Sequence, residues 1–476
     1  MNWPRKFLLL LAAIIVAGAL ALGVRNYAQR QAWQRMRPEL PALVGAEAPG
    51  LDARLAADVS RLQVWPPDLT ALAEYARLCH ANGLLEPATT GYQALVILEP
   101  GEARWPHLLA SILAGYGRLD EALPLLRRTT QLAPDYLVAW LRLGSALFKA
   151  NDIAGAEAAY QAALTRAPGN SYALLGLARC DLQLERWTAA RSHLQQAVAS
   201  DPTSGGAQSL LASVFDRLGN PAGAALARTR MENGGLYIEP TDAWLDELTA
   251  YCHNPYTLLT AASSTVADGR VRQALPALER ALSLAPDDAR IRRQLAKVRF
   301  ALGDPVEARA QMERAVALAP GDENMRFDLV DLMRKMKDHE ALSRAVAAGL
   351  AACPTSTAMQ FEAGLLAVEA WQMDEAESHF QFAWQNRPDN PSAARALADV
   401  YFRTNRSEAG LEVLEKIIAR KPQVTVLHVE LVEHGIELRD PRTAGWLRRA
   451  IDSGSPELPS AELKQNYRRR FGVELQ

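Results

Sequence analysis

The chain lacks what several functional classes require. Its 52 Lys and Arg face 54 Asp and Glu, so the net charge of −2 has none of the basic excess typical of nucleic-acid-binding proteins. Four cysteines in 476 residues are too few for a disulfide scaffold. With 29 Gly, 27 Pro and 49% hydrophobic residues, the composition excludes a low-complexity chain and is typical of a folded protein.

Motifs for catalysis and cofactor binding are also missing. None of the 8 histidines lies in an H-E-x-x-H motif, and no phosphate loop, G-x-S-x-G elbow or C-x-x-C occurs. The adjacent pairs Cys79-His80 and Cys252-His253 are poor metal ligands, because neighbours on a helix point about 100° apart. We therefore predict no enzyme activity, no metal, no cofactor and no small-molecule substrate.

Long hydrophobic runs are absent except for one, over residues 7–24. Arg5 and Lys6 precede it, and its 18 residues would span about 27 Å as a helix, close to the roughly 30 Å of a bilayer core. Aromatic residues flank the run, as expected at membrane interfaces: Trp3, Tyr27 and Trp33. The pattern predicts a single-pass transmembrane or signal-anchor helix within residues 1–36.

Two alternatives to an anchor stay open, a cleaved signal peptide and a buried helix of a cytosolic protein. Ala19-Leu20-Ala21 has the form of a cleavage site, although it lies inside the run. The orientation is also ambiguous, since four arginines after the run favour a cytoplasmic body by the positive-inside rule. The short amino-terminal flank favours export, and we place the body on the periplasmic side.

Prolines recur every 34 residues along most of the chain. They occupy positions 100, 134, 168 and 202, and then 286, 320, 354, 388, 422 and 456. The gap between Pro202 and Pro286 equals two repeats and 16 further residues. A fixed period of this length is the signature of a repeat protein.

Laid on this period, the chain contains eleven units. They start at residues 69, 103, 137, 171, 205, 255, 289, 323, 357, 391 and 425. Positions 8 and 20 of each unit carry mostly Ala or Gly, which lets two helices pack closely, and the proline ends the second helix. We therefore predict an all-α, right-handed α-solenoid of about eleven 34-residue helix-turn-helix repeats.

The unit at 137–170 identifies the family that the pattern resembles, the tetratricopeptide repeat (TPR). The signature positions of that family carry Trp140, Leu143, Gly144, Ala156, Tyr160, Ala163 and Pro168. The resemblance covers residues 69–458 apart from the 16-residue insert. It implies stacked helix pairs that bind protein or peptide segments.

The repeats divide the chain into six predicted segments. These are the anchor at 1–36, a linker and capping helix at 37–68, five repeats at 69–238, an inserted helix at 239–254, six repeats at 255–458 and a capping helix at 459–476. Thr241 or Asp242 can cap the inserted helix, whose Trp244, Leu248 and Cys252 share one face. The insert either plugs a groove or joint between the two blocks or acts as a hinge or specificity element.

The resemblance implies that positions 2, 5, 9, 12 and 13 of each first helix face the binding groove. The candidate groove residues are Phe148, Lys149, Tyr172, Arg179, Arg290, Arg293, Lys297, Phe300, Phe327, Arg334, Lys335, Arg395, Phe402 and Arg403, with Arg77, His80, Arg104 and His107 in the earlier units. Arg and aromatic side chains suit an extended acidic or C-terminal peptide. Solvated helix faces are the open alternative.

Leu141 and Ser145 stand where chaperone-binding TPR domains carry the Lys and Asn of their carboxylate clamp, so that clamp is not predicted. The functional prediction is a membrane-tethered scaffold or adaptor for protein partners, with no nucleic acid bound. The layout resembles bacterial envelope TPR proteins, which implies a role in envelope assembly or biogenesis. A regulatory subunit of a membrane enzyme or protease is the alternative.

Overall fold

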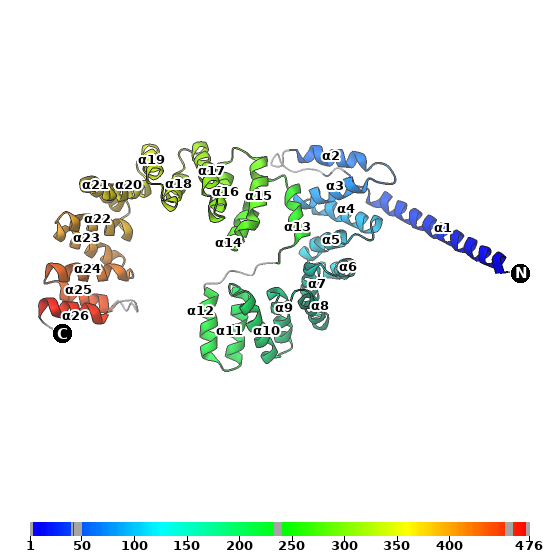
Figure 1. Cartoon of the computed structure of the whole chain (residues 1–476), viewed down its shortest axis with the longest axis horizontal. Coiled ribbons are helices and arrows are strands. Elements are labelled where there is room, and N and C mark those ends of the chain that lie inside the picture. Colours follow the sequence, from blue (N-terminus) through cyan, green and yellow to red (C-terminus); the bar gives the residue numbers. More distant parts are fainter. Residues whose placement is uncertain (1–2, 40, 42–49, 233–239, 453–459, 473–476) are drawn as a thin grey trace. The chain divides into compact units, whose positions relative to one another are not determined.

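The computed structural model describes residues 3–39, 41, 50–232, 240–452 and 460–472. Throughout these residues the regular elements are 26 α-helices and one 3-10 helix, with no strand, which confirms the all-α, TPR-like solenoid (Figure 1). The chain forms two compact units, residues 1–287 and 288–476, which are described separately.

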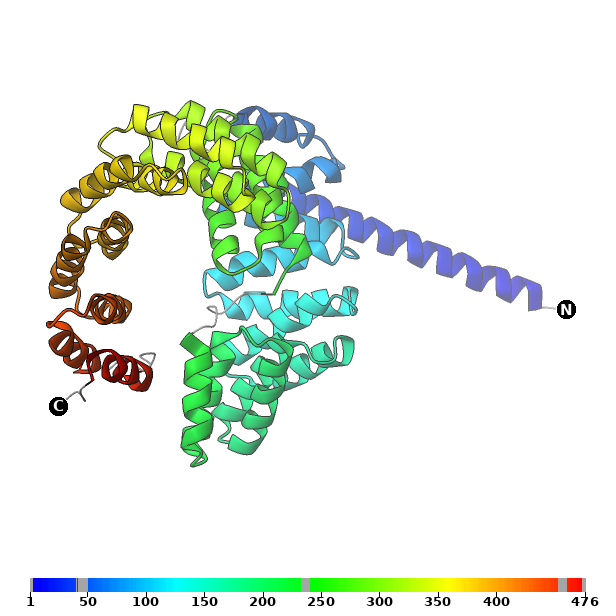
Figure 2. The same cartoon turned by 60° about the vertical axis from the view of Figure 1, so that its left-hand side comes forward.

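The first unit begins with one long helix, α1 (Trp3–Met36). Its carboxyl-terminal end packs on α4 (Leu85–Leu98), where Trp33 is buried and Gln29 donates a hydrogen bond to the Ile97 carbonyl at 3.2 Å. Its amino-terminal part projects from the repeats of this unit in both cartoon views (Figures 1 and 2).

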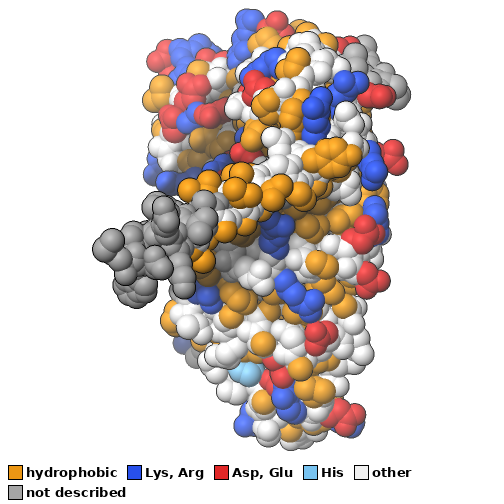
Figure 3. Space-filling view, turned by 90° about the vertical axis from the view of Figure 1, so that its right-hand side faces the viewer, with side chains coloured by type: hydrophobic (Ala, Val, Ile, Leu, Met, Phe, Trp, Pro, Cys, Tyr) orange, Lys and Arg blue, Asp and Glu red, His pale blue; other side chains and the backbone are white. Residues whose placement is uncertain are grey.

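Apolar side chains in the part of α1 that precedes its contact with α4 are exposed. They include Leu10, Ile14, Ile15, Val16, Leu20, Leu22 and Val24. Figure 3 shows hydrophobic side chains exposed on the face from which α1 projects. The side chains of residues 7–9, 11 and 12 of the predicted membrane run lie outside the described part. In that described part, no helix reaches the length and hydropathy that a membrane crossing requires.

Six helix pairs follow in the first unit, preceded by the amphipathic helix α2 (Leu51–Arg61), which buries Leu51 and Leu55. The predicted linker before α2 lies largely outside the described residues. The first helices are α3 (Leu69–Ala81), α5 (Arg104–Gly115), α7 (Leu137–Lys149), α9 (Ser171–Gln183), α11 (Gly205–Arg217) and α14 (Pro255–Ala267). The second helices are α4, α6 (Leu119–Leu132), α8 (Ile153–Arg166), α10 (Trp187–Ser200), α12 (Pro221–Glu232) and α15 (Val271–Leu284).

Small residues lie where the helices of a pair cross. Ala88, Ala122 and Ala156, at position 20 of successive repeats, are fully buried. Gly144 at position 8 of its repeat and Gly176 at position 6 of the next repeat leave space that a large side chain fills. A Cβ on Gly144 would lie 2.7 Å from the ring of Tyr160, and one on Gly176 would lie 2.4 Å from the same ring.

The insert folds as two short pieces, α13 (Ala243–Asp246) and the 3-10 helix η1 (Glu247–Tyr251). The Asp242 side chain accepts a hydrogen bond from the Leu245 backbone N–H at 3.4 Å, which confirms Asp242 as the helix cap. Glu239 lies outside the described residues. Because η1 packs on both α3 and α15, the pair α14–α15 belongs to the first unit.

The second unit contains five helix pairs and the predicted C-terminal helix. They are α16 (Ala289–Ala301), α17 (Pro305–Leu318), α18 (Glu323–Met336), α19 (His339–Ala352), α20 (Thr357–Glu369), α21 (Met373–Asn386), α22 (Pro391–Arg403), α23 (Ser407–Arg420), α24 (Thr425–Leu438), α25 (Thr443–Asp452) and α26 (Ser460–Phe471). The α26 helix covers the end of this stack, where Leu463 and Tyr467 are buried against α24 and α25.

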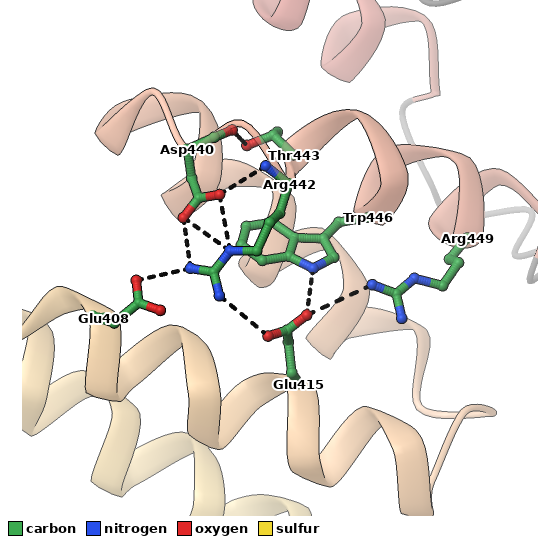
Figure 4. A network of polar contacts seen from close by, with 7 residues as sticks. All are labelled: Glu408, Glu415, Asp440, Arg442, Thr443, Trp446 and Arg449. Carbon is green, nitrogen blue, oxygen red and sulfur yellow. Dashed lines mark hydrogen bonds and ion pairs between the residues drawn. The ribbon is translucent and has the colours of Figure 1, made fainter.

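A polar network joins the second helices of the last two pairs (Figure 4). Arg442 pairs with Asp440 at 2.7 Å and reaches across to Glu408 at 2.8 Å. The buried Trp446 donates a hydrogen bond from its indole Nε1 to Glu415 at 2.7 Å, and the Arg442 guanidinium lies over the Trp446 ring. These contacts fix the register of α25 on α23.

Candidate functional site

Residues 240–254, here called the inserted segment, lie on the first helices of the first three repeats. The α13 helix packs on α5, and η1 packs on α3. We call five residues of the first three repeats that hydrogen-bond to the segment the docking face: Arg77, Asn82, His107, Tyr136 and Arg142. Three further repeat side chains contact the segment outside this face, Arg104 of α5 and Gln273 and Arg280 of α15. In Figure 1, α13 lies beside α3 and α5.

The centre of the docking face binds a carboxylate. The Asp242 side chain accepts hydrogen bonds from His107 Nε2 at 2.8 Å, Arg142 Nε at 2.6 Å and the Tyr136 hydroxyl at 2.8 Å. His107 is 0% exposed and Asp242 is 3% exposed. These three donors, which we call the carboxylate site, come from α5, α7 and the turn before α7.

The electrostatics favour an ionised Asp242. Burial alone would raise the pKa of this carboxyl group, but the hydrogen bond and charge of His107 and the charge of Arg142 outweigh it. The pKa of Asp242 is therefore held well below its usual range. Burial, together with the hydrogen bond to Asp242, raises the pKa of Tyr136 far above its usual value, so the hydroxyl stays protonated and donates.

An aromatic side chain accompanies the carboxylate. The Trp244 ring stacks on Tyr136 with a centroid separation of 3.8 Å and meets the edge of His107 at 5.1 Å. The Trp244 backbone N–H also points at the Tyr136 hydroxyl, 3.4 Å away. The repeats thus hold a two-residue pattern, an acidic side chain followed two positions later by an aromatic one.

Asn82 binds the other end of the inserted segment through its backbone. Its Nδ2 donates to the Tyr251 carbonyl at 2.9 Å, and its Oδ1 accepts from the His253 N–H at 2.7 Å. Arg77 Nη1 donates to the Tyr251 hydroxyl at 3.0 Å and its guanidinium lies over the Tyr251 ring. Side chains of the repeats therefore bind the segment at both ends.

Two of the predicted groove residues line a small pocket next to the carboxylate site. Tyr172 and Arg179 face it from α9, and Arg142, Ser145 and Pro240 are among the other lining residues. Its volume is about 60 Å³. Phe148, by contrast, packs against the core of this unit, and Lys149 is exposed at the end of α7.

The sequence matches two family models, both described as Tetratricopeptide repeat. One matches residues 147–214, 265–329 and 367–428, and the other matches residues 107–171. The chain contains tetratricopeptide repeats. Such repeats are typical of non-enzymatic protein-interaction scaffolds. A search of curated proteins found no match.

Solved structures with similar folds have low sequence identity. Yeast Tom70 is 12% identical with a TM-score of 0.35, over 85% of this chain and 96% of its own. MamA from Desulfovibrio magneticus RS-1 is 16% identical with a TM-score of 0.32, over 36% and 96%. A thermophilic TPR protein of Thermus thermophilus is 22% identical with a TM-score of 0.29, over 38% and 98%.

In the second unit, the predicted basic residues of the TPR first helices are paired with acids. Asp328, Glu362 and Glu430 occupy position 6 of their repeats, and each faces a basic side chain of the preceding repeat. The pairs are Arg293 and Lys297 with Asp328, Arg334 with Glu362, and Arg395 with Glu430. Lys297 Nζ lies 2.8 Å from Asp328.

The other predicted basic residues pair locally. Arg290 contacts Asp288 at 2.9 Å, Lys335 contacts Asp331 at 2.7 Å, and Arg403 contacts Asp399 at 2.8 Å. The basic side chains predicted to line a channel thus form ion pairs with acidic side chains of the same unit. These acids compensate the positive charge that would otherwise attract an acidic peptide. Such partly exposed pairs contribute little stability each.

The predicted aromatic residues of the second unit are dispersed. Phe402 stacks on His434 at a centroid distance of 3.8 Å, and Phe300 packs against the core between α16 and α19. Phe327 is exposed. The structure gathers these three side chains at no common site.

Sequence reasoning missed most of the docking face. Asn82, Tyr136 and Arg142 are absent from the predicted groove residues, and Asp242 was predicted only as a helix cap. His107 and Arg77 were predicted to face the groove, and both contact the inserted segment. The sequence held one indication of this site. A carboxylate that caps a helix has lone pairs left, so Asp242 could also accept hydrogen bonds from donors on the repeats.

Proposed function

We propose that this chain is a membrane-tethered scaffold that binds protein segments on the first-helix faces of its TPR repeats. The observation that carries the proposal is the docking face, where repeat side chains already bind a chain segment. They contact its backbone through Asn82, its carboxylate through Arg142 and its aromatic ring through Tyr136. These are the interactions by which repeat scaffolds recognise peptides.

The tether is proposed from the sequence of residues 7–24 and the exposure of α1. Ile15, Leu20 and Val24 are each exposed by about two thirds of their surface, which is unfavourable in water and favourable in lipid. With α1 as a single-pass anchor, the scaffold collects its partners at the membrane surface. We place the repeats on the periplasmic side and the partners in envelope assembly.

Site-specific photo-crosslinking in cells tests the binding proposal. A photoreactive amino acid at Tyr172, beside the carboxylate site, should crosslink to a discrete partner protein. The same amino acid at Gln195, exposed on the second helix of the same repeat, is the control and should give none. Arg142→Ala should remove the Tyr172 product. Equal crosslinking at both positions, or none at either, would contradict a binding surface on the first helices.

Protease accessibility tests the proposed location. A tag at the C-terminus should be digested in spheroplasts and protected in intact cells if the repeats are periplasmic. Protection until the cells are lysed would place the repeats in the cytoplasm instead.

A further inference from the structure

The inserted segment is held as a ligand would be held. We propose that Asp242 and Trp244 form an intramolecular ligand of the docking face, and that the same face binds a partner segment with an acidic residue followed two positions later by an aromatic one. This inference rests on the proposed function, that first-helix faces bind protein segments. It adds the chemistry of the partner and a segment of the chain that competes with it.

The buried carboxylate is the first argument. A helix that only filled space between repeats would do so with apolar side chains, because a buried ion costs desolvation free energy unless it is fully paired. Here Asp242 is 3% exposed and receives three side-chain hydrogen bonds from the repeats. Arg142 and His107 are therefore arranged around a negative charge, which a partner carboxylate can supply equally well.

The backbone contact is the second argument. The Asn82 amide contacts the segment through the Tyr251 carbonyl and the His253 N–H, which every non-proline residue possesses. Another backbone following the same path would make the same pair of bonds. Selectivity then comes from the carboxylate site and from the stacking surface of Tyr136.

The short helices of the segment are the third argument. With four residues in α13 and five in η1, the segment has too few internal hydrogen bonds to be stable by itself. Its conformation therefore depends on contacts with the repeats: the docking face, the burial of Leu248 and the hydrogen bond from Arg280 to the Cys252 carbonyl. Exchange for another chain loses these contacts and few hydrogen bonds within the segment itself. Being tethered, the segment competes at an effective concentration of about millimolar, which weakens binding of any partner added in solution.

A binding experiment on the full chain tests the inference. The probe is a fluorescent peptide with the sequence of residues 240–254. It should bind weakly to the wild-type chain and about tenfold or more tightly to the Asp242→Asn/Trp244→Ala chain, whose docking face is vacated. Adding Arg142→Ala to that chain should abolish binding. Asp246→Asn, a change of an exposed acid on the same short helix, is the matched control and should bind as weakly as the wild type.

A second peptide and a second readout keep the test independent of folding. A probe with Asn at the position of Asp242 should lose at least tenfold in affinity for the vacated chain. The wild-type probe should also raise the thermal midpoint of that chain, which shows that the vacated face is folded and accepts the peptide. Equal binding to the wild-type and vacated chains, or equal binding of both probes, would overturn the inference.

Two further outcomes are distinguishable. If the wild-type chain forms a dimer that Asp242→Asn/Trp244→Ala abolishes, the segment docks on a second copy and the intramolecular assignment is wrong. If the peptide tests fail while Tyr172 still crosslinks to a partner protein, the scaffold function stands without an intramolecular ligand. Failure of both experiments would overturn the proposed function as well.

Discussion

At the scale of single residues, Asp58 contributes a pH-dependent term to stability. This side chain of α2 is 4% exposed, and its Oδ2 has no hydrogen-bond partner among the described residues. Burial, with the charge of Glu74, raises the pKa of Asp58 to about 6, against the smaller opposing effect of Arg61. The folded chain therefore favours the protonated form of this carboxyl group.

Replacing Asp58 by Asn should stabilise the first unit at neutral pH. The pKa of Asp58 is higher in the folded chain than in the unfolded chain, so below about pH 4 the wild-type chain carries no cost from this side chain. As the pH rises through about 6, the buried carboxyl group ionises and the free energy of unfolding of the wild-type chain falls. Asn cannot ionise, so the variant avoids this loss. The gain at pH 7.5 should be about 1–3 kcal/mol, since one pKa unit corresponds to about 1.4 kcal/mol. Urea unfolding at pH 4.5 and 7.5 measures it.

Asp52, exposed on the same helix, provides the control for that prediction. Asp52→Asn should change the free energy of unfolding by less than about 0.5 kcal/mol at either pH. A gain for Asp58→Asn that is the same at both pH values would contradict a buried carboxyl group with a raised pKa.

At the scale of helices, a tyrosine between two glycines joins the third and fourth repeats. The Tyr160 ring of α8 lies so close to Gly144 and Gly176 that a Cβ on either would come within 3 Å of it. Gly176→Ala should therefore destabilise the first unit by about 1–3 kcal/mol, because the new Cβ displaces the Tyr160 ring from its packing between α7 and α9. Thermal unfolding measures the loss.

Gly206 on α11 is the matched control, because a Cβ there meets nothing within 4 Å. Gly206→Ala should be neutral or stabilise by up to about 1 kcal/mol, since alanine favours a helix. If both substitutions destabilise equally, backbone conformation rather than the Tyr160 contact explains the cost.

The repeats were predictable from sequence because their determinants are local and periodic. Prolines end the second helices, and small residues such as Ala76 and Ala88 mark the crossings, which are fully buried in the structure. The ion pairs of the second unit were harder to predict from sequence, although acids recur at position 6 of the repeats, in Asp328, Glu362 and Glu430. Pairing requires knowing which first helices lie side by side.

The carboxylate site could not be predicted in the same way. Asp242 is 135 residues from His107 and 100 residues from Arg142 in the chain, and it belongs to a segment outside the repeat period. Because the other repeats have no equivalent of Asp242, comparing the repeats with one another does not indicate which side chains bind it. The sequence predicted that the insert either plugs a groove or joint or acts as a hinge or specificity element, and the structure adds the side chains that bind it.

At the scale of the whole molecule, the proposed tether makes a prediction about fractionation. Ile15→Arg/Val16→Arg should release the chain from membranes, because each arginine at the centre of a membrane helix costs about 2.5–3.5 kcal/mol. Leu226→Arg, at an exposed leucine of α12, is the control and should leave the distribution unchanged. Ultracentrifugation of lysed cells measures it, and a wild-type chain found wholly in the supernatant would contradict the tether.

The central claim is that the repeats bind the inserted segment as a ligand and do not need it to fold. Hydrogen exchange on the full-length Arg142→Ala chain tests this most directly. Losing a hydrogen bond to a charged group costs about 1.5–3 kcal/mol, so amides of residues 243–252 should exchange about 10- to 100-fold faster, while those of α9 and α10 stay unchanged. Unchanged exchange in the segment, or an equal increase throughout the first unit, would contradict the account.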